Sequence, residues 1–138
     1  MTYHRFTAAE IPALWQLHTA YKAEIGEDTP TDADFKRLKK AVADGEILFF
    51  GAFDGEKVVG CCSVTVGFST FNYEKSGVFE DFYILPECRH KGIARELVRF
   101  AYRESGVSSM TVGCADCDVA MYKSLGFSVK IGNLLAFE

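Results

Sequence analysis

The chain has 138 residues and a net charge of −4, and 49% of its residues are apolar. This length and composition predict one folded domain, residues 1–138, and exclude an intrinsically disordered protein. The acidic balance argues against a nucleic-acid-binding protein, and no apolar run approaches the ~20 residues of a membrane span. The opening MTYHRFTAAE carries no secretory or lipidation signal, so we expect a cytoplasmic protein.

Hydrophobic periodicity and turn residues predict the following elements in chain order. A short strand (3–6) precedes a helix within 8–26, and a second helix within 27–45 starts with Thr31 or Asp32 as N-cap. A β-hairpin spans 46–68 with its turn at Asp54-Gly55, and a loop covers 69–77. There follow a strand (78–85), a helix (91–105), a strand (108–114), a short helix (118–127) and a last strand within 128–138 that closes the sheet. This order predicts an α/β fold whose mixed, mainly antiparallel sheet is flanked by helices.

The cysteines could form a metal or redox site, because Cys114 and Cys117 have CxxC spacing. One such pair is a weak signal, since structural zinc needs four ligands. Cys61 and Cys62 are adjacent, so on a strand they point to opposite faces. We therefore favour reduced structural thiols and expect no metal.

The strand VFEDFYIL (78–85) is apolar on both faces, which is typical of a central strand covered on both sides. Alternation places Val78, Phe82 and Ile84 on one face and points the neighbours Glu80 and Asp81 to opposite faces. Buried carboxylates are rare unless they are paired or functional, so both acids are candidate site residues.

The next segment, RHKGIAREL, combines positive charge with the start of a helix. A helix N-terminus leaves backbone N–H groups unpaired and favours an anion. Gly92 has no side chain and Ala94 has a small one, so a phosphate can come close to the backbone of the turn. Arg89, Lys91 and Arg95 add positive charge. This pattern predicts a diphosphate site; the alternative is an ordinary helix start with solvated basic residues.

Two motifs make the chain similar to a known family. Arg89-x-x-Gly92-x-Ala94 matches the (Gln/Arg)-x-x-Gly-x-(Gly/Ala) signature of the GNAT superfamily of acyl-CoA-dependent N-acetyltransferases, and AMYKSLGF (120–127) resembles its second signature. The resemblance implies a GNAT fold with splayed central strands, a β-bulge near Glu80 or Asp81, and acetyl-CoA as co-substrate. The backbone of Phe82, Tyr83 and Ile84 is then expected to pair with pantetheine. The diphosphate is expected on the N–H groups from Arg89 to Arg95, that is on Arg89, His90, Lys91, Gly92, Ile93, Ala94 and Arg95.

The resemblance also implies the chemistry. Tyr122 takes the place of the family's proton donor to the departing thiolate; the alternative is an aromatic packed beneath the Gly-Phe turn. EDF (80–82) resembles the diamine and thialysine branch, in which the Glu is the suspected base, so Glu80 is expected to accept the proton of the amine. Asp81 is expected to bind substrate.

Acidic residues between the first two helices suggest the acceptor. Glu27 and Asp28 lie in EIGEDTPTDAD (24–34), which has no basic residue, and in the family this segment commonly walls the acceptor site. We therefore expect direct acetyl transfer to a primary amine of a small cationic molecule. The alternative for these acids is helix capping and solvation.

Alternative functions are a protein or peptide acetyltransferase and a non-catalytic acyl-CoA-binding regulatory module. The second signature has Ala115 where an Asn is usual, which is the support for the non-catalytic module. Family analogy allows a homodimer.

Overall fold

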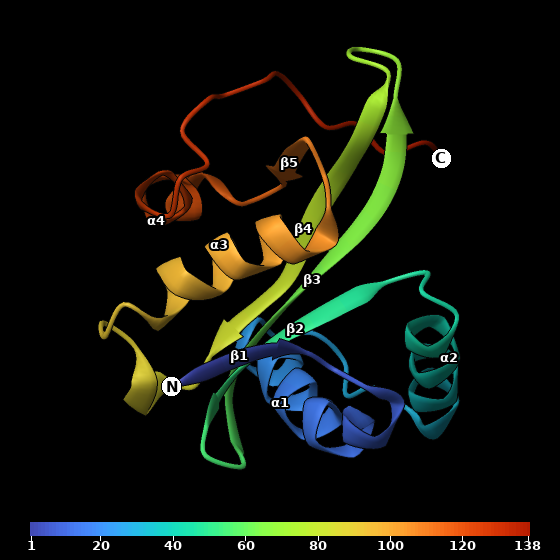
Figure 1. Cartoon of the computed structure of the whole chain (residues 1–138), viewed down its shortest axis with the longest axis vertical. Helices are drawn as coiled ribbons and strands as arrows, with labels where there is room; N and C mark the ends of the chain where they lie inside the picture. Colours follow the sequence, from blue (N-terminus) through green and yellow to red (C-terminus); the bar gives the residue numbers. More distant parts are fainter.

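A single twisted sheet organises the molecule. The computed structural model describes residues 1–138. The strands lie in the order in which they occur in the chain; the first four pair antiparallel and the last pairs parallel to its neighbour (Figure 1). They are β1 (Thr2–Arg5), β2 (Leu48–Asp54), β3 (Lys57–Ser69), β4 (Glu74–Ile84) and β5 (Ser109–Val112).

Helices cover both faces of this sheet, as Figure 1 shows. They are α1 (Ile11–Glu24), α2 (Asp32–Ala43), α3 (Ile93–Ser105) and α4 (Val119–Ser124), with short 3₁₀ turns at Ala8–Glu10, Pro86–Cys88 and Asp116–Asp118. The crossover from β4 through α3 to β5 is the predicted βαβ unit. The α/β fold with a mixed, mainly antiparallel sheet is therefore confirmed.

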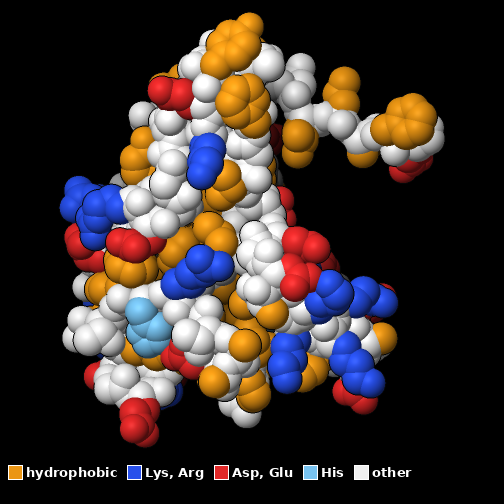
Figure 2. Space-filling view, turned by 45° about the vertical axis from the view of Figure 1, so that its right-hand side comes forward, with side chains coloured by type: hydrophobic (Ala, Val, Ile, Leu, Met, Phe, Trp, Pro, Cys, Tyr) orange, Lys and Arg blue, Asp and Glu red, His pale blue; other side chains and the backbone are white.

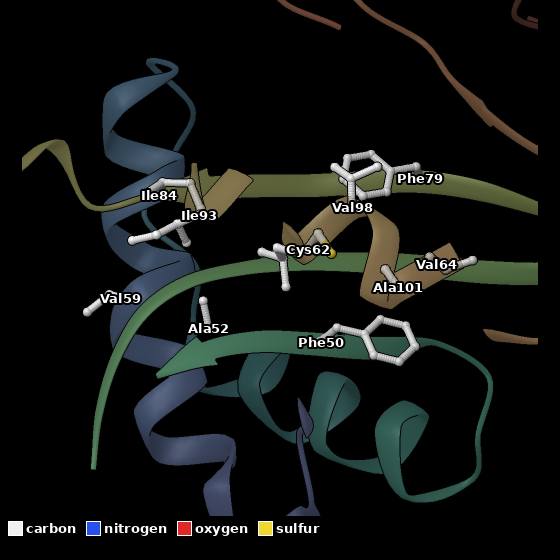
Figure 3. Packing of buried hydrophobic residues seen from close by; sticks show 11 residues of the cluster. Phe50, Ala52, Val59, Cys62, Val64, Phe79, Ile84, Ile93, Val98 and Ala101 are labelled. Carbon is white, nitrogen blue, oxygen red and sulfur yellow. The ribbon is translucent and has the colours of Figure 1, made fainter. Parts of the chain in front are cut away.

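Alternation along the central strands divides the core into two clusters. Phe50 and Cys62 pack with α3 on one face, whereas their neighbours Phe49 and Cys61 pack with α1 on the other. Figure 3 shows the α3-side cluster between that helix and the sheet. Cys61 and Cys62 are both fully buried, and burial raises the pKa of each thiol, so neither is a ready nucleophile.

Local signals placed several boundaries correctly. Thr31 is the N-cap of α2: its Oγ1 accepts from the Asp34 N–H (3.2 Å), while Asp34 Oδ2 accepts from the Thr31 N–H (2.9 Å). The hairpin turns at Asp54-Gly55 as predicted, with Gly55 at φ +61°.

Two predicted elements are wrong. The loop predicted at residues 69–77 is too long: only residues 70–73 form a turn, because β3 and β4 run on as a long hairpin in which Ser69 pairs with Glu74. Residues 128–138 form no strand and do not close the sheet. Both errors concern cross-strand pairing, which depends on distant residues and not on the local pattern.

None of the helices has the length and apolar character that crossing a membrane requires.

Candidate active site

An opening between β4 and β5 forms the centre of the candidate site. β5 pairs with β4 only from Ser76 to Phe79 and ends at Val112. Residues 80–84 of β4 therefore have β3 on one side and no strand on the other. The splayed central strands implied by the resemblance are present, and they leave a free strand edge inside the fold.

A β-bulge lies at the start of this free edge. Ser63 pairs with Glu80 and Cys61 with Tyr83, so two residues of β4 oppose Cys62 alone. Asp81 in the bulge has φ +52°, a left-handed conformation that costs a non-glycine residue energy. The bulge expected near Glu80 or Asp81 is confirmed.

The bulge changes which side chains share a face. Phe79, and not Val78, packs on the same cluster as Phe82 and Ile84, with the Phe79 and Phe82 ring centroids 5.5 Å apart. Strict alternation predicted Val78 on that face, and this is wrong because the extra residue reverses the alternation.

Backbone direction along β4 follows from two hydrogen bonds. The Leu85 N–H donates to Val59 O on β3 (2.9 Å), whereas Ile84 O accepts from Arg89 Nε on the opposite, open side (2.9 Å). Because backbone groups alternate along a strand, Phe82 and Ile84 face the opening and Tyr83 faces β3. Of the three residues expected to pair with pantetheine, Phe82 and Ile84 thus offer their backbone groups to the opening.

The turn into α3 carries free hydrogen-bond donors. None of the backbone N–H groups of residues 90–95 donates a hydrogen bond within the protein. The first N–H group of α3 that does so belongs to Glu96, which donates to Gly92 O (3.3 Å). The Arg89 N–H is already bonded to Pro86 O (3.3 Å), so it does not join this set. His90 and Gly92 have φ of +61° and +82°, and such left-handed residues help successive N–H groups to converge on an anion. A Cβ on Gly92 would meet nothing within 4 Å, so this glycine is required by its conformation and not by crowding.

Basic side chains around this turn have different partners. The Arg89 guanidinium donates to both carboxylate oxygens of Glu24 on α1 (2.9 and 2.8 Å) and lies 5.4 Å from the centre of the Tyr83 ring. Arg95 donates to Ser124 O at the end of α4 (3.1 Å). Lys91 is exposed and makes no ion pair. Arg89 therefore ties the turn to α1, which leaves Lys91 as the cation free to meet a ligand.

Tyr122 on α4 is partly buried beside the opening. Its ring lies 6.2 Å from that of Phe82 and 5.8 Å from that of Phe127. Its hydroxyl donates no hydrogen bond within the protein. Burial, with a smaller effect of Tyr21, raises the pKa of Tyr122 to about 12, so the phenol keeps its proton at neutral pH.

Glu80 and Asp81 lie on the same face of the sheet. Ser63 is paired with Glu80, and directly opposed residues share a face; Ser63 Oγ also donates to Asp81 Oδ2 (2.6 Å). The expectation that they point to opposite faces is wrong, because the bulge turns Asp81 round. Asp81 is half-buried, whereas Glu80 is exposed and forms no ion pair.

Residues of α1 that sequence reasoning passed over face Asp81. Burial lowers the pKa of His18, and the negative charge of Asp81 opposes that shift. Burial also raises the pKa of Tyr21, and the charge of Asp81 adds a smaller increase. The hydrogen bond from Lys22 Nζ to Glu27 Oε2 (2.7 Å) raises the pKa of Lys22, and Asp81 adds to it. His18, Tyr21 and Lys22 have the i, i+3, i+4 spacing of one helix face, which is the signal that could have grouped them.

A hollow of about 720 Å³ lies between α1, α2 and the segment that joins them. Glu27 and Asp28, both expected at the acceptor site, line it together with Asp34, and His18 and Lys22 line the α1 side. The His18 Nδ1 is buried without a partner. The hollow thus carries three carboxylates against one lysine, and His18 connects it to the neighbourhood of Asp81.

The cysteine pair with CxxC spacing lies at the protein surface. Cys114 and Cys117 are exposed free thiols. No group of three or more His, Cys, Asp or Glu side chains is arranged to hold a metal ion.

The split sheet and the turn with unpaired N–H groups are the features that the resemblance in the sequence implied, and comparison with known proteins agrees with that resemblance. The model of the acetyltransferase (GNAT) family matches residues 11–127, so the chain belongs to that family and is an acetyltransferase. No curated protein matches the chain.

Solved structures show the same fold. A probable acetyltransferase is 24% identical, with a TM-score of 0.84 and coverage of 100% of this chain and 99% of that one. An aminoglycoside acetyltransferase from an uncultured soil metagenomic sample, solved with sisomicin, is 17% identical (TM-score 0.83; coverage 99% and 94%). A predicted acetyltransferase from Clostridium acetobutylicum, solved with acetyl-CoA, is 15% identical (TM-score 0.79; coverage 99% and 95%).

Proposed function

We propose that this acetyltransferase moves the acetyl group of acetyl-CoA to a primary amine of a small cationic molecule. The observation that carries the proposal is the run of unpaired N–H groups at residues 90–95, which lies at the end of the open edge of β4. A diphosphate needs several convergent donors, and these residues provide them without displacing any protein hydrogen bond. The residues present therefore fit the cofactor.

The chain would hold acetyl-CoA at three places. The N–H groups of residues 90–95 and the Lys91 side chain would bind the diphosphate, and the outward-facing backbone of Phe82 and Ile84 would bind the pantetheine amides as an added strand does. When bound, acetyl-CoA supplies the thioester whose acetyl group is transferred. A β4 N–H at the opening would stabilise the negative charge that develops on the carbonyl oxygen.

Two protein groups would handle the protons. An amine reaches the site as an ammonium ion, which the carboxylate of Asp81 attracts; Glu80, on the same face and free of ion pairs, takes the proton. Tyr122 Oη, with its raised pKa, gives a proton to the departing sulfur. The exposed position of Glu80 favours transfer through water, since solvent reaches its carboxylate.

The hollow beside α1 supports a cationic acceptor. Glu27 is neutralised by Lys22 and Asp34 lies beside Arg37, but Asp28 has no ion-pair partner and can meet a second positive charge of the substrate. The fold neighbour solved with sisomicin, an aminoglycoside, is consistent with an acceptor of this kind. Polyamines, basic amino acids and aminoglycosides share the required chemistry.

Thiol-release kinetics with acetyl-CoA would test the proposal. The acceptors are diamines, polyamines, lysine analogues, aminoglycosides and short peptides, each assayed with the wild type, Asp28→Asn and Asp32→Asn. We expect Asp28→Asn to raise KM for multiply charged amines by up to about fivefold, because a single exposed charge pair contributes at most ~1 kcal/mol. Asp32→Asn, an exposed acid of the same segment that does not line the hollow, should leave KM unchanged. Faster turnover of peptides than of small amines would contradict the assigned substrate class.

A further inference from the structure

Tyr21 on α1 is a half-buried tyrosine whose hydroxyl has no partner in the protein. Among the tyrosine hydroxyls of the chain, only that of Tyr102 takes part in a hydrogen bond. The Tyr21 ring packs at the edge of the core cluster on the α1 side, and its centroid lies 6.0 Å from that of the Tyr83 ring. Tyrosine hydroxyls that are held by packing usually find a hydrogen-bond partner. The packing of Tyr21 leaves its hydroxyl available to a bound molecule.

The neighbours of Tyr21 are Asp81 and the candidate proton donor. Beyond the bulge, Asp81 and Tyr83 lie two positions apart on β4, so their side chains share the face that α1 covers. Burial raises the pKa of Tyr21 and the charge of Asp81 adds to that shift, so the phenol is within electrostatic range of this carboxylate. After burial, Tyr21 is the next contributor to the raised pKa of Tyr122. Tyr21 is thus close both to the residue that attracts the amine and to the residue that protonates the sulfur.

The Asp81 carboxylate has one oxygen that no protein group uses. Its Oδ2 accepts the hydrogen bond from Ser63 Oγ (2.6 Å), whereas Oδ1 accepts none and Asp81 forms no ion pair. A primary ammonium group has three N–H donors, and each needs an acceptor once water is displaced. Asp81 Oδ1 provides one acceptor, and the Glu80 carboxylate on the same face provides a second. The Tyr21 hydroxyl oxygen can provide the third.

The ring of Tyr21 is less available to a substrate than its hydroxyl. Lys22 Nζ lies 5.7 Å from the centre of this ring and is held there by its hydrogen bond to Glu27 Oε2 (2.7 Å). A second cation on the same ring would be repelled by Lys22. The hydroxyl is therefore the part of Tyr21 that can contact an incoming ammonium group.

We propose that Tyr21 binds the reacting nitrogen of the acceptor and selects primary amines. Its Oη accepts one N–H of the acceptor ammonium group, Asp81 Oδ1 accepts the second, and Glu80 accepts the third and removes that proton. Tyr21 keeps its own proton and forms no covalent bond with the substrate. This assignment rests on the proposed transfer to an amine.

Selection follows from the number of N–H groups on the acceptor. A secondary ammonium ion has one N–H fewer, which would leave the Tyr21 oxygen facing an N-methyl group. Primary and secondary ammonium ions carry the same charge, and basic and acidic side chains are interspersed on the face shown in Figure 2, so attraction at long range does not separate the two ions. A site built to accept a hydrogen bond, in contrast, rejects an analogue that lacks the donor.

Thiol-release kinetics with n-butylamine at saturating acetyl-CoA test the hydroxyl. This amine has a single charge, so the hollow beside α1 contributes no second ion pair. Tyr21→Phe keeps the ring on Tyr83 and should lower kcat/KM about tenfold through the loss of one hydrogen bond to a charged group, with the dissociation constant of coenzyme A unchanged. Tyr3→Phe removes a half-buried hydroxyl from β1, which β2 and β3 separate from β4, and should change neither value. Equal losses in both variants would overturn the proposal.

N-methylbutylamine tests the selectivity, either as a substrate or as a competitor of n-butylamine. Tyr21→Phe should leave its kcat/KM, or its inhibition constant, nearly unchanged, because the secondary amine has no N–H for Tyr21 to accept. A hydroxyl with a purely structural role would affect both amines alike. That result would reject the assignment of Tyr21.

A measurement by ¹⁹F NMR, on protein with 3-fluorotyrosine at its six tyrosine positions, detects binding without turnover. The resonance that is missing from Tyr21→Phe belongs to Tyr21. With coenzyme A present, n-butylamine should shift this resonance and leave that of Tyr3 in place. An unshifted Tyr21 resonance at the highest amine concentration would overturn the assignment even if thiol is released. Absence of thiol release with every amine would instead contradict the proposed function, whatever the Tyr21 resonance does.

Discussion

Ser63 Oγ on β3 donates a 2.6 Å hydrogen bond to Asp81 Oδ2 on β4, across the bulge that opposes two residues to Cys62. This contact holds Asp81 on the face of α1 and beside Glu80, so two carboxylates meet at the place where β4 loses its second neighbour. A left-handed φ at Asp81 is the conformational cost of that placement.

The arrangement around the Ser63–Asp81 contact predicts different roles for the two acids: Asp81 binds the amine and Glu80 accepts its proton. Asp81→Asn should raise KM for amines, because it removes the charge that attracts the ammonium ion, while Glu80→Gln should lower kcat by about 10²-fold, because it removes the proton acceptor. Initial rates over a range of amine concentrations separate the two effects, because one variant should change KM and the other kcat. An unchanged kcat in Glu80→Gln would remove Glu80 from the mechanism.

Ser63→Ala tests the positioning role of the same contact. The loss leaves Asp81 half-buried without its partner and should destabilise the protein by about 1–3 kcal/mol. Because Asp81 keeps its charge but not its orientation, kcat/KM should fall while the salt dependence of KM stays as in the wild type. Ser63→Thr retains a hydroxyl and should recover most of the lost kcat/KM. Failure of the Thr variant to do better than the Ala variant would argue against a hydrogen-bonding role.

Tyr122→Phe should lower kcat by about 10²-fold with little change in the dissociation constant of coenzyme A, because the ring and its packing remain while the proton donor is lost. With its pKa raised to about 12, Tyr122 stays protonated as the pH rises, and its proton is lost only as the pH approaches that value. The wild-type kcat should therefore show no decline attributable to Tyr122 below about pH 10. Tyr102→Phe, which removes an exposed hydroxyl bonded to Ser108 O, is the matched control and should leave kcat unchanged.

Gly92→Ala should affect both stability and ligand binding. Gly92 at φ +82° has open space around it, so the cost is conformational, about 1–2 kcal/mol, and relief of that strain would disturb the N–H groups of the turn. Thermal melting and calorimetric titration with coenzyme A measure the two effects.

Gly106→Ala at the other end of α3 provides the control, since Gly106 has φ +70° and equally open surroundings. Both variants should melt at lower temperature, but only Gly92→Ala should raise the dissociation constant of coenzyme A. If both raised it equally, the turn at residues 90–95 would not be the binding element.

The Arg89–Glu24 pair gives a prediction whose sign is informative. Removing the negative charge of Glu24 should tighten the binding of an anion if charge alone mattered. Because Glu24 anchors Arg89 and with it the turn, we expect Glu24→Ala to weaken coenzyme A binding instead, by up to about fivefold, as this pair is partly exposed. Arg89→Ala should have a similar effect, and the double variant should be no worse than either. Tighter binding by Glu24→Ala would show that the pair does not position the turn.

Local chemistry in the sequence was sufficient for much of the fold and part of the site. Thr31 and Asp54-Gly55 marked a helix start and a hairpin turn because capping and turn formation involve residues a few positions apart. The spacing from Arg89 to Ala94 indicated an anion site for the same reason: the unpaired N–H groups of residues 90–95 arise from the start of one helix.

Contacts between distant segments were decided only by the tertiary structure. The bulge at Asp81 involves Ser63, 18 positions away, and the orientation of Arg89 depends on Glu24, 65 positions away. No local pattern specifies either partner. The extension of β3 and β4 into residues 69–77 likewise depends on pairing between the two strands. Residues 128–138 show the limit most clearly. Their apolar pattern predicted a strand, but a strand forms only when a neighbouring strand supplies its hydrogen bonds, and none of the five strands pairs with this segment.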